Sequence, residues 1–262
     1  MKGYMCRFNG KSLKFDKING SLRKEGEFSV IVPTYNESEN IKNLIEEIRK
    51  NIKKTKFSNS YEIVIVDDNS KDGTSEIIDS LSKNKDVVAL HRYGMKGLFS
   101  AVGDGIKISS GKYVLTMDAD FSHPPELIPK FIKNSDENDI VYGSRYVKGG
   151  GIKRVALTRK ICSKILNVLC IFIAGLNVSD FGGQFRLFRK ESYEKITYEY
   201  PSNFAEYGIE LFYRAKKLGL KMKAIPFTYE FREKGKSKMG NLKNLFILGK
   251  DYLLMALRLR LE

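Results

Sequence analysis

The sequence lacks several residue types on which common protein sites depend. It has no tryptophan, two histidines and three cysteines among 262 residues. Cys6, Cys162 and Cys170 are odd in number and lie at no spacing typical of metal ligands. A zinc cage is therefore disfavoured, and a reducing compartment such as the cytosol is favoured.

Long hydrophobic runs are also absent. The N-terminal stretch MKGYMCRFNGKSLKFDKING has no run of about seven apolar residues, which a signal peptide would need. No other stretch reaches the roughly 18 apolar residues that span a bilayer. We therefore expect a chain that does not cross a membrane by itself.

Charge is abundant and unevenly distributed. The formal net charge of +15 indicates a polyanionic partner, which is nucleic acid, an anionic membrane face or a phosphorylated substrate. Residues 1–27 carry +4, residues 28–150 carry −1 and residues 151–262 carry +12. We interpret residues 1–27 as a flexible basic extension that has room for a short strand or hairpin.

Apolar, β-rich runs alternate with helical spacing from Phe28 onward. The runs are FSVIVP, YEIVIVD, DVVALH, KYVLTMD and DIVYG, and the helical segments are 37–53, 73–83, 97–109 and 124–135. This alternation predicts an α/β fold, with a mostly parallel, Rossmann-like sheet covered by helices on both faces. Ligands bind such sheets at the carboxyl ends of the strands.

Carboxylates follow two of these strands. Asp118 and Asp120 flank Ala119 directly after the run that ends at Met117, and on an extended chain both carboxylates point the same way. That arrangement suits Mg²⁺ or Mn²⁺, which take oxygen ligands and share them with water and phosphate. The alternative is a solvated pair that caps the helix after it.

Asp67 and Asp68 end an earlier strand. A separate cap, Lys71-Asp72-Gly73-Thr74, opens the helix after them, so capping does not explain both carboxylates. An aspartate here would accept hydrogen bonds from the N–H edge of a nucleobase. The competing interpretation is that Asp67 only starts the helix.

Six motifs in order carry a resemblance to a known family. They are FSVIVPTYNESENI, YEIVIVDDNSKDGT, GKYVLTMDADFSHPPELIPKFI, IVYGSRYVKGGG, SDFGGQFRLFRKES and FREKGKSKMG, which run from about Phe28 to Gly240. The chain resembles family-two glycosyltransferases and, among them, the dolichol-phosphate mannose synthases.

The resemblance implies a glycosyltransferase A-type fold, a GDP-mannose donor, a divalent metal and a polyprenyl-phosphate acceptor. It places the catalytic domain at residues 28–240 and a C-terminal amphipathic helix at 241–262. The donor-binding residues carried over are Pro33, Tyr35, Glu37, Asp67, Asp68, Asp118, Ala119, Asp120, Arg232 and Lys238. Asp118, Asp120 and Ser122 would hold the metal, although some relatives have Gln where this chain has Ser122.

The resemblance also assigns an acceptor-phosphate set. Arg145 follows the DIVYG strand, while Arg159 and Ser163 are four residues apart on an expected helix over 156–174. A guanidinium and a hydroxyl so placed would clamp a phosphate. The residues alone favour a solvated helix face instead, because Lys160 and Lys164 lie there too.

Arg232 and Lys238 match the R-x-x-G-x-S-K stretch of the family, which resembles a loop closing over the donor diphosphate. Arg232 joins Asp120 and Arg145 among the expected catalytic residues. The alternative for this stretch is an exposed basic loop with no catalytic duty.

The expected reaction is a single displacement with inversion. An acceptor phosphate is mostly a dianion at neutral pH and needs no strong base, so positioning and charge neutralisation suffice. Related processive polysaccharide synthases carry a Q-x-x-R-W signature, which a chain without tryptophan does not contain. The rival donor is UDP-glucose, and a nucleic-acid-binding module is the rival class that we disfavour.

The hydrocarbon chain of a polyprenyl phosphate lies in a bilayer, so we expect the protein to bind peripherally to the cytosolic face of a membrane. Segments 165–176 and 242–261 are the candidates, the second with Leu245, Phe246, Leu253, Ala256 and Leu257 on one side. Ordinary core helices are the alternative for both. The expected partners are the nucleotide sugar, the lipid phosphate and the membrane surface, with room for a small membrane-anchoring subunit and with no nucleic acid.

Overall fold

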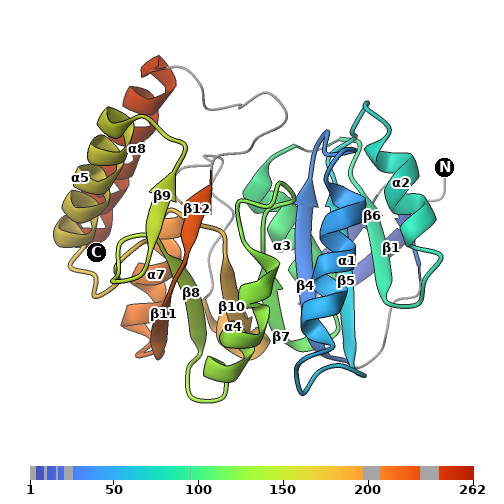
Figure 1. Cartoon of the computed structure of the whole chain (residues 1–262). Helices are drawn as coiled ribbons and strands as arrows, with labels where there is room; N and C mark the ends of the chain where they lie inside the picture. The colour runs from blue at the N-terminus through green and yellow to red at the C-terminus, as the bar shows by residue number, and fades with distance from the viewer. Residues whose placement is uncertain are drawn as a thin grey trace.

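The computed structural model describes residues 4–8, 11–15, 17–20, 26–94, 96–196, 207–230 and 242–262, and an eight-stranded sheet forms its centre (Figure 1). The strands of this sheet are β3 (Lys17–Asn19), β4 (Gly26–Thr34), β5 (Tyr61–Asp67), β6 (Val87–His91), β7 (Gly111–Thr116), β8 (Ile140–Ser144), β10 (Arg186–Arg189) and β11 (Met222–Pro226). Two smaller sheets pair β1 (Tyr4–Phe8) with β2 (Lys11–Phe15), and β9 (Gly151–Lys153) with β12 (Thr228–Glu230).

The strand order is β11-β8-β10-β7-β4-β5-β6-β3. Neighbouring strands are parallel, except that β10 runs antiparallel to β7 and β8, and β3 runs antiparallel to β6. The expected mostly parallel α/β sheet is therefore confirmed.

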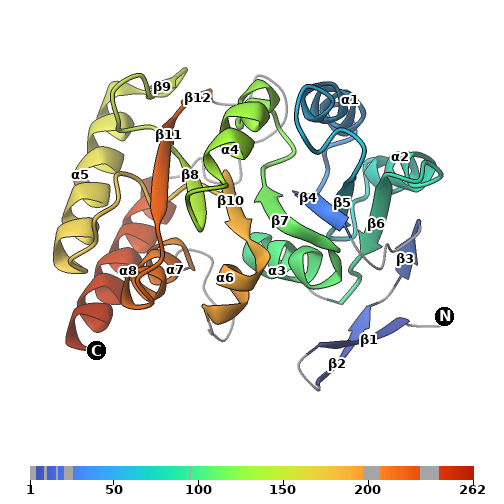
Figure 2. The ribbon, with the colours of Figure 1, turned by 90° about the horizontal axis from the view of Figure 1, so that it is seen from below.

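Helices cover both faces of the sheet (Figure 2). One side carries α1 (Ile41–Ile52), α2 (Thr74–Leu81), and α4 (Ile128–Asn134) with the short 3-10 turn η1 (Pro125–Leu127). The other side carries α3 (Leu98–Ile108), α6 (Lys190–Lys195), α7 (Tyr207–Lys217) and α8 (Leu242–Leu261), with α5 (Leu157–Ile173) packed against α8.

The strands are apolar on both sides, as a doubly covered sheet requires. Val30 and Val32 of β4 enter the core with α1, whereas Ile31 between them enters the core with α3. Side chains of an extended strand alternate between faces, so this one strand feeds two cores.

The sheet reaches into the segment that the sequence assigned to a flexible extension. Residues 17–19 form β3, Ile18 is buried, and Asn19 Nδ2 donates to Asp79 Oδ1 of α2 at 2.6 Å. The sequence left room for a short strand in this extension but could not locate it, because three residues are too few to show a period.

Helix α8 also differs from expectation. Ala256 is fully buried against the core while its neighbour Leu257 is 49% exposed, although the sequence placed both on one side. Apolar residues therefore face two directions on α8. Within the described residues, no helix is long and apolar enough to cross a membrane.

A hydrogen-bonded cluster ties β4, β5 and β7 together at their amino ends. Ser29 Oγ donates to Glu62 Oε1 at 2.7 Å and accepts from the Gly111 N–H at 2.9 Å, and the Ser110 N–H donates to Glu62 Oε1 at 2.6 Å. Gly111 lies so close to β4 that an added Cβ would be 2.6 Å from the Ser29 nitrogen. Only glycine allows this approach.

Gly111→Ala is expected to lower the free energy of unfolding by about 3 kcal/mol, the upper end of overpacking costs, because the obstructing atoms are backbone. Urea denaturation followed by circular dichroism measures it. The control is Gly94→Ala, where no described heavy atom lies within 4 Å of the added Cβ. Equal midpoints for the two variants would contradict the close approach of β4 and β7.

Candidate active site

The chain changes direction across the sheet between β4 and β7. It runs outward through β4, β5 and β6 and then returns to place β7 on the other side of β4. Pairing between β4 and β7 stops at Ile31 and Thr116, after which the Met117 N–H donates to the Ile31 carbonyl at 3.1 Å. A crevice outside the carboxyl ends is expected at such a switch point.

Two loops on the β5 side of the crevice are joined by hydrogen bonds. The Asn36 N–H donates to Ser70 Oγ at 2.8 Å, and the Lys71 N–H returns a bond to Asn36 Oδ1 at 2.9 Å. The Glu37 N–H donates to Thr74 Oγ1 at 2.9 Å. The loops after β4 and β5 therefore form one surface.

The residues expected around the nucleoside lie on or beside this surface. Pro33 is buried in β4, and Glu37 is buried with Oε2 accepting from Asn40 Nδ2 at 2.9 Å. Tyr35 is half-buried, and the Lys96 Nζ lies 5.0 Å from its ring centroid. Of these three side chains, Tyr35 has the greatest exposed area for a flat ligand.

Asp67 is engaged within the fold. Its carboxylate is fully buried and accepts from Ser70 Oγ at 2.5 Å and Ser75 Oγ at 2.7 Å, with His91 Nδ1 at 3.3 Å. Burial alone would raise the pKa of Asp67, but the hydrogen bonds from His91 and the serines outweigh it and lower the pKa. Asp67 thus positions Ser70 and Ser75. The sequence placed Asp67 against the donor and did not reveal its contact with His91.

Asp68 is also held internally. The Arg92 Nε donates to Asp68 Oδ1 at 2.7 Å, and the Gly97 N–H donates to Oδ2 at 2.8 Å. Arg92 continues to Asp104 Oδ2 at 3.0 Å, so one buried guanidinium joins β5, β6 and α3. Arg92 was not singled out from sequence, although its place directly after β6 was a usable signal.

Asp118 and Asp120 follow the carboxyl end of β7, on the other side of the switch point. Asp118 is 29% exposed, Asp120 is half-buried, and Ala119 between them is buried in the core. Both aspartates are thus partly accessible, while the alanine between them faces the core. Asp120 Oδ1 also accepts the Ser122 N–H at 3.1 Å, closing a tight turn.

These residues fit a divalent cation. The Ser122 hydroxyl is buried and has no hydrogen-bond partner among the described residues. A hard cation takes such oxygen donors and fills its remaining positions with water and phosphate oxygens. No group of three or more His, Cys, Asp and Glu side chains within the described ranges could hold a metal, so the protein would supply few of the ligands.

His123 holds the 118–122 turn from its buried side. The Asp118 N–H donates to His123 Nδ1 at 2.9 Å, and the imidazole stacks on Phe185 with ring centroids 5.0 Å apart. Burial, together with Arg145 and Arg186 nearby, lowers the pKa of His123 to about 4. The ring is therefore neutral at pH 7 and can accept that backbone hydrogen bond.

Arg145 is bound by an aspartate that sequence reasoning missed. Its Nε and Nη2 donate to the two Asp180 oxygens at 2.7 and 2.8 Å, and its own N–H donates to Oδ2 at 3.0 Å. Burial would lower the pKa of Arg145, but Asp180 outweighs it and raises the pKa. The expected phosphate-binding role is thus limited to the edge of the guanidinium that faces away from Asp180.

The other expected acceptor residues lie on α5. Ser163 Oγ and Tyr146 Oη are 2.9 Å apart, and the Arg145 guanidinium lies 5.2 Å from the Tyr146 ring centroid. The structure therefore brings Ser163 and Arg145 together through Tyr146. Arg159 is half-buried one turn earlier on the same helix.

Two expected residues, Arg232 and Lys238, lie outside the described residues. Gly182 lies next to Arg145, because an added Cβ at this glycine would be 3.0 Å from Arg145 Nη2. Asp180 and Gly182 are therefore shaped around Arg145.

Asp180→Asn is expected to lower the free energy of unfolding by about 3 kcal/mol, because it leaves the Arg145 guanidinium, whose side chain is only 17% exposed, without its counter-charge. The control is Asp136→Asn, which breaks an ion pair with Lys56 in which both side chains are exposed, and it should cost less than about 1 kcal/mol. Urea denaturation of the two variants compares them. Similar costs would show that Asp180 does not hold Arg145 in solution.

Curated relatives cover most of this chain. It is 39% identical to the dolichol-phosphate mannosyltransferase of Pyrococcus furiosus over 80% of the chain, and it spans only 58% of that relative's length. It is 34% identical to the polyprenol monophosphomannose synthase of Mycolicibacterium smegmatis, over 80% of each chain.

Solved structures share the fold. Mannosyl-3-phosphoglycerate synthase from Rubrobacter xylanophilus aligns with a TM-score of 0.65 at 20% identity, covering 90% of this chain and 74% of that one. Glucosyl-3-phosphoglycerate synthase from Mycobacterium tuberculosis, crystallised with Mn²⁺, UDP and glucosyl-3-phosphoglycerate, aligns with a TM-score of 0.60 at 16% identity over 89% of this chain and 80% of that one. The model of glycosyl transferase family 2 matches residues 29–197, and the chain belongs to this family.

Proposed function

We propose that the chain transfers mannose from GDP-mannose to a dolichyl or other polyprenyl phosphate, giving a β-linked mannosyl phosphate. The observation that carries this proposal is the pair Asp118 and Asp120, which reach the surface at the switch point opposite the joined loops after β4 and β5. The names of the P. furiosus and M. smegmatis relatives support the choice of sugar and acceptor.

The donor would extend from the loops after β4 and β5 to the carboxyl end of β7. A flat base beside Tyr35 on one wall would leave the diphosphate at Asp118 and Asp120 on the other. Asp118, Asp120 and Ser122 would hold Mg²⁺ or Mn²⁺, which supplies positive charge to the departing diphosphate. Arg232 and Lys238 would add to that charge.

The acceptor needs placement more than activation. A phosphate monoester has a second pKa near 6 and is therefore largely a dianion at neutral pH, so its oxygen attacks without a strong base. Arg159, Ser163 and the outer edge of Arg145 would hold it behind the anomeric carbon. Attack from that side inverts the configuration, which turns an α-linked donor into a β-linked product.

The test is a donor screen with purified protein, Mn²⁺ or Mg²⁺, a short polyprenyl phosphate and a panel of nucleotide sugars. Transfer is expected from GDP-mannose with a β-linked product by NMR. Asp120→Asn should reduce the rate by about 100-fold or more, because the metal's contribution to charge neutralisation is worth several kcal/mol.

Each other outcome of the screen has a distinct meaning. Transfer from UDP-glucose alone would replace mannose by glucose in the proposed reaction. An α-linked product would exclude a single displacement. Full activity of Asp120→Asn would contradict the assignment of Asp120 as a metal ligand. Circular dichroism of Asp120→Asn controls for folding.

An apolar face on α5 and α8 supports peripheral membrane binding. Nine of the twelve exposed large hydrophobic side chains in the described residues lie on these two helices. They are Leu157, Ile161, Ile165, Val168, Leu169 and Phe172 on α5, and Leu254, Leu257 and Leu261 on α8. The two helices contact each other and lie side by side at one end of the molecule (Figures 1 and 2), so these exposed side chains are concentrated there.

The spacing on α5 is helical, since Leu157, Ile161, Ile165, Val168 and Phe172 recur every three or four residues. Phe172 is 81% exposed, which is costly in water and favourable in the interfacial region of a bilayer. The +12 charge of residues 151–262 would add attraction to anionic lipid.

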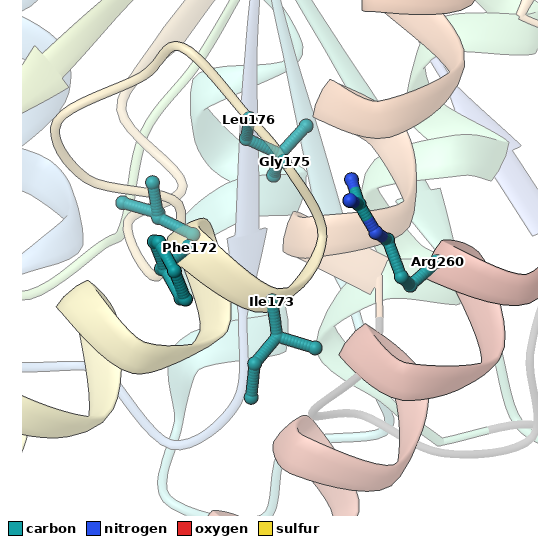
Figure 3. Close-up of a pocket in the computed structure, with 6 residues that line it drawn as sticks. Phe172, Ile173, Gly175, Leu176 and Arg260 are labelled. Atoms are coloured by element: carbon teal, nitrogen blue, oxygen red, sulfur yellow. The ribbon is translucent and has the colours of Figure 1, made fainter.

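An open groove of about 550 Å³ lies at the C-terminal ends of α5 and α8 (Figure 3). Its lining includes Phe172, Ile173 and Leu176 of α5 and the turn after it, and Arg260 of α8 reaches toward Gly175. Lys216 Nζ donates to the Gly175 carbonyl at 2.5 Å. Helices α5 and α8 both end at this groove, so Arg260 and Lys216 balance the partial negative charge of the helix C-termini. We therefore do not assign the groove to the donor.

Replacing Phe172 by Asp is expected to weaken vesicle binding by about tenfold or more, the amount that burial of one large apolar side chain supplies. Flotation with phosphatidylcholine vesicles, with and without an anionic lipid, measures it. The control is Leu218→Asp, which alters a side chain 49% exposed outside both helices. Equal losses for the two variants would contradict this face, and equal binding to both lipid mixtures would remove the electrostatic part.

A further inference from the structure

His91 is a buried imidazole that the proposed reaction does not use. It lies at the end of β6 and is 1% exposed, with Asp67 Oδ2 at 3.3 Å from Nδ1 and Asp79 Oδ1 at 2.7 Å from Nε2. Tyr93 stacks on it with ring centroids 6.2 Å apart. A histidine with a carboxylate at each nitrogen donates to both when protonated.

The network around His91 reaches the donor pocket in three steps. Asp67, held by His91, accepts from Ser70 Oγ at 2.5 Å, and Ser70 Oγ accepts the Asn36 N–H at 2.8 Å. Asn36 has a φ of 57° and directly follows Tyr35. The position of the loop beside the expected base therefore depends on the orientation of the Asp67 carboxylate.

The register of the sheet explains why these groups meet. Thr34 of β4 pairs with Asp67 of β5, and Asp67 pairs with His91 of β6. The three strand ends thus form one row at the carboxyl edge. Asp79 approaches from α2 and is also bound by Asn19 of β3. Lys17 of β3 is the residue paired with His91 in the register of the sheet.

The charges favour a protonated ring. Burial would lower the pKa of His91, but its hydrogen bonds to Asp67 and Asp79 outweigh it and raise the pKa above the ordinary 6.5. The stabilisation is therefore complete below pH 6.5 and is lost as the pH rises through the raised value. The pKa of Asp67 is lowered, so its own contribution is lost only as the pH falls through a value below 3.8.

We propose that His91 is a positioning residue for the nucleoside part of the donor, which it fixes by orienting Asp67, Ser70 and the Asn36 loop. This rests on the proposed function, because it assumes that a nucleoside binds beside Tyr35. A purely structural His91 would stabilise the fold through Asp67 and Asp79 alike, whereas a positioning role is carried by the Asp67 contact.

Two substitutions separate the contacts. His91→Asn places an amide near the position of Nδ1 and keeps a donor to Asp67, while His91→Gln extends toward Nε2 and keeps a donor to Asp79. Isothermal titration with GDP and with UDP, and the KM and kcat for the donor, are measured for both variants. Thermal unfolding reports the loss of stability.

His91→Gln is expected to weaken nucleoside diphosphate binding and to raise the donor KM, each by about tenfold, because the charge-assisted hydrogen bond to Asp67 is lost. The kcat should change by less than about twofold. His91→Asn should stay within about twofold of wild type. Equal effects of the two variants on binding, in step with their loss of stability, would overturn the positioning role.

A pH titration gives a second measure that holds even if one variant folds poorly. The chain has two histidines, so the imidazole resonance missing from His91→Gln identifies His91 by NMR. When the ring becomes neutral, the closer Asp79 contact at 2.7 Å keeps the remaining proton on Nε2, and Nδ1, which is 3.3 Å from Asp67, no longer donates. Wild-type nucleotide binding should therefore weaken as the pH rises through the His91 pKa, and Asp79→Asn should shift that weakening to lower pH. A His91 pKa below 6.5, or no shift in Asp79→Asn, would overturn the proposal.

The result also separates this inference from the proposed function. A wild-type chain that binds neither GDP nor UDP contradicts the proposed function itself. A wild-type chain that binds GDP, together with a His91→Gln variant that binds equally well, contradicts only the role of His91.

Discussion

The site depends on how β4 pairs with its two neighbours. On one side β4 stays in register with β5 as far as Thr34 and Asp67, and on the other it leaves β7 after Ile31. The first side is closed by hydrogen bonds between loops, and the second opens where Asp118 follows β7. The switch point therefore has hydrogen-bonded loops on one side and accessible carboxylates on the other, because a parallel sheet places both strand ends at the same edge.

Three buried aspartates at this edge each have a cation supplied by the fold. Asp67 has His91, Asp68 has Arg92 and Asp180 has Arg145. Such pairing is required because an ionised carboxylate removed from water without a counter-charge would be neutralised. Asp118, in contrast, remains 29% exposed, so phosphate-bound ions have access to it. The fold thus distinguishes carboxylates that hold loops from a carboxylate that stays accessible, although Asp67, Asp68 and Asp118 all stand at the carboxyl end of a strand.

That distinction marks the limit of what the sequence could predict. Strand and helix periods located the sheet and the helices over residues 28–174, and strand-end carboxylates located the edge. The pair Arg145–Asp180 was missed because its members are 35 residues apart and meet only through β10, a four-residue antiparallel strand between β7 and β8. His91 was missed for a related reason, since its partners come from β5 and α2. On α8 the apolar pattern did not say which side would face the core, because both sides are apolar.

Helix α5 connects the two parts of the proposed reaction. A polyprenyl phosphate has an anionic head that must stay near water and a chain that must stay in lipid. Within one turn α5 offers Ser163, which contacts Tyr146 beside the crevice, and Ile165, which is 54% exposed on the apolar face. The first turns of a helix carry partial positive charge, and Arg159 lies there, so the acceptor phosphate of the proposed reaction would be favoured at that end of α5. A helix lying flat on a bilayer would then deliver the head to the crevice without extracting the chain, which explains why a water-exposed site and an exposed apolar face occur on the same element.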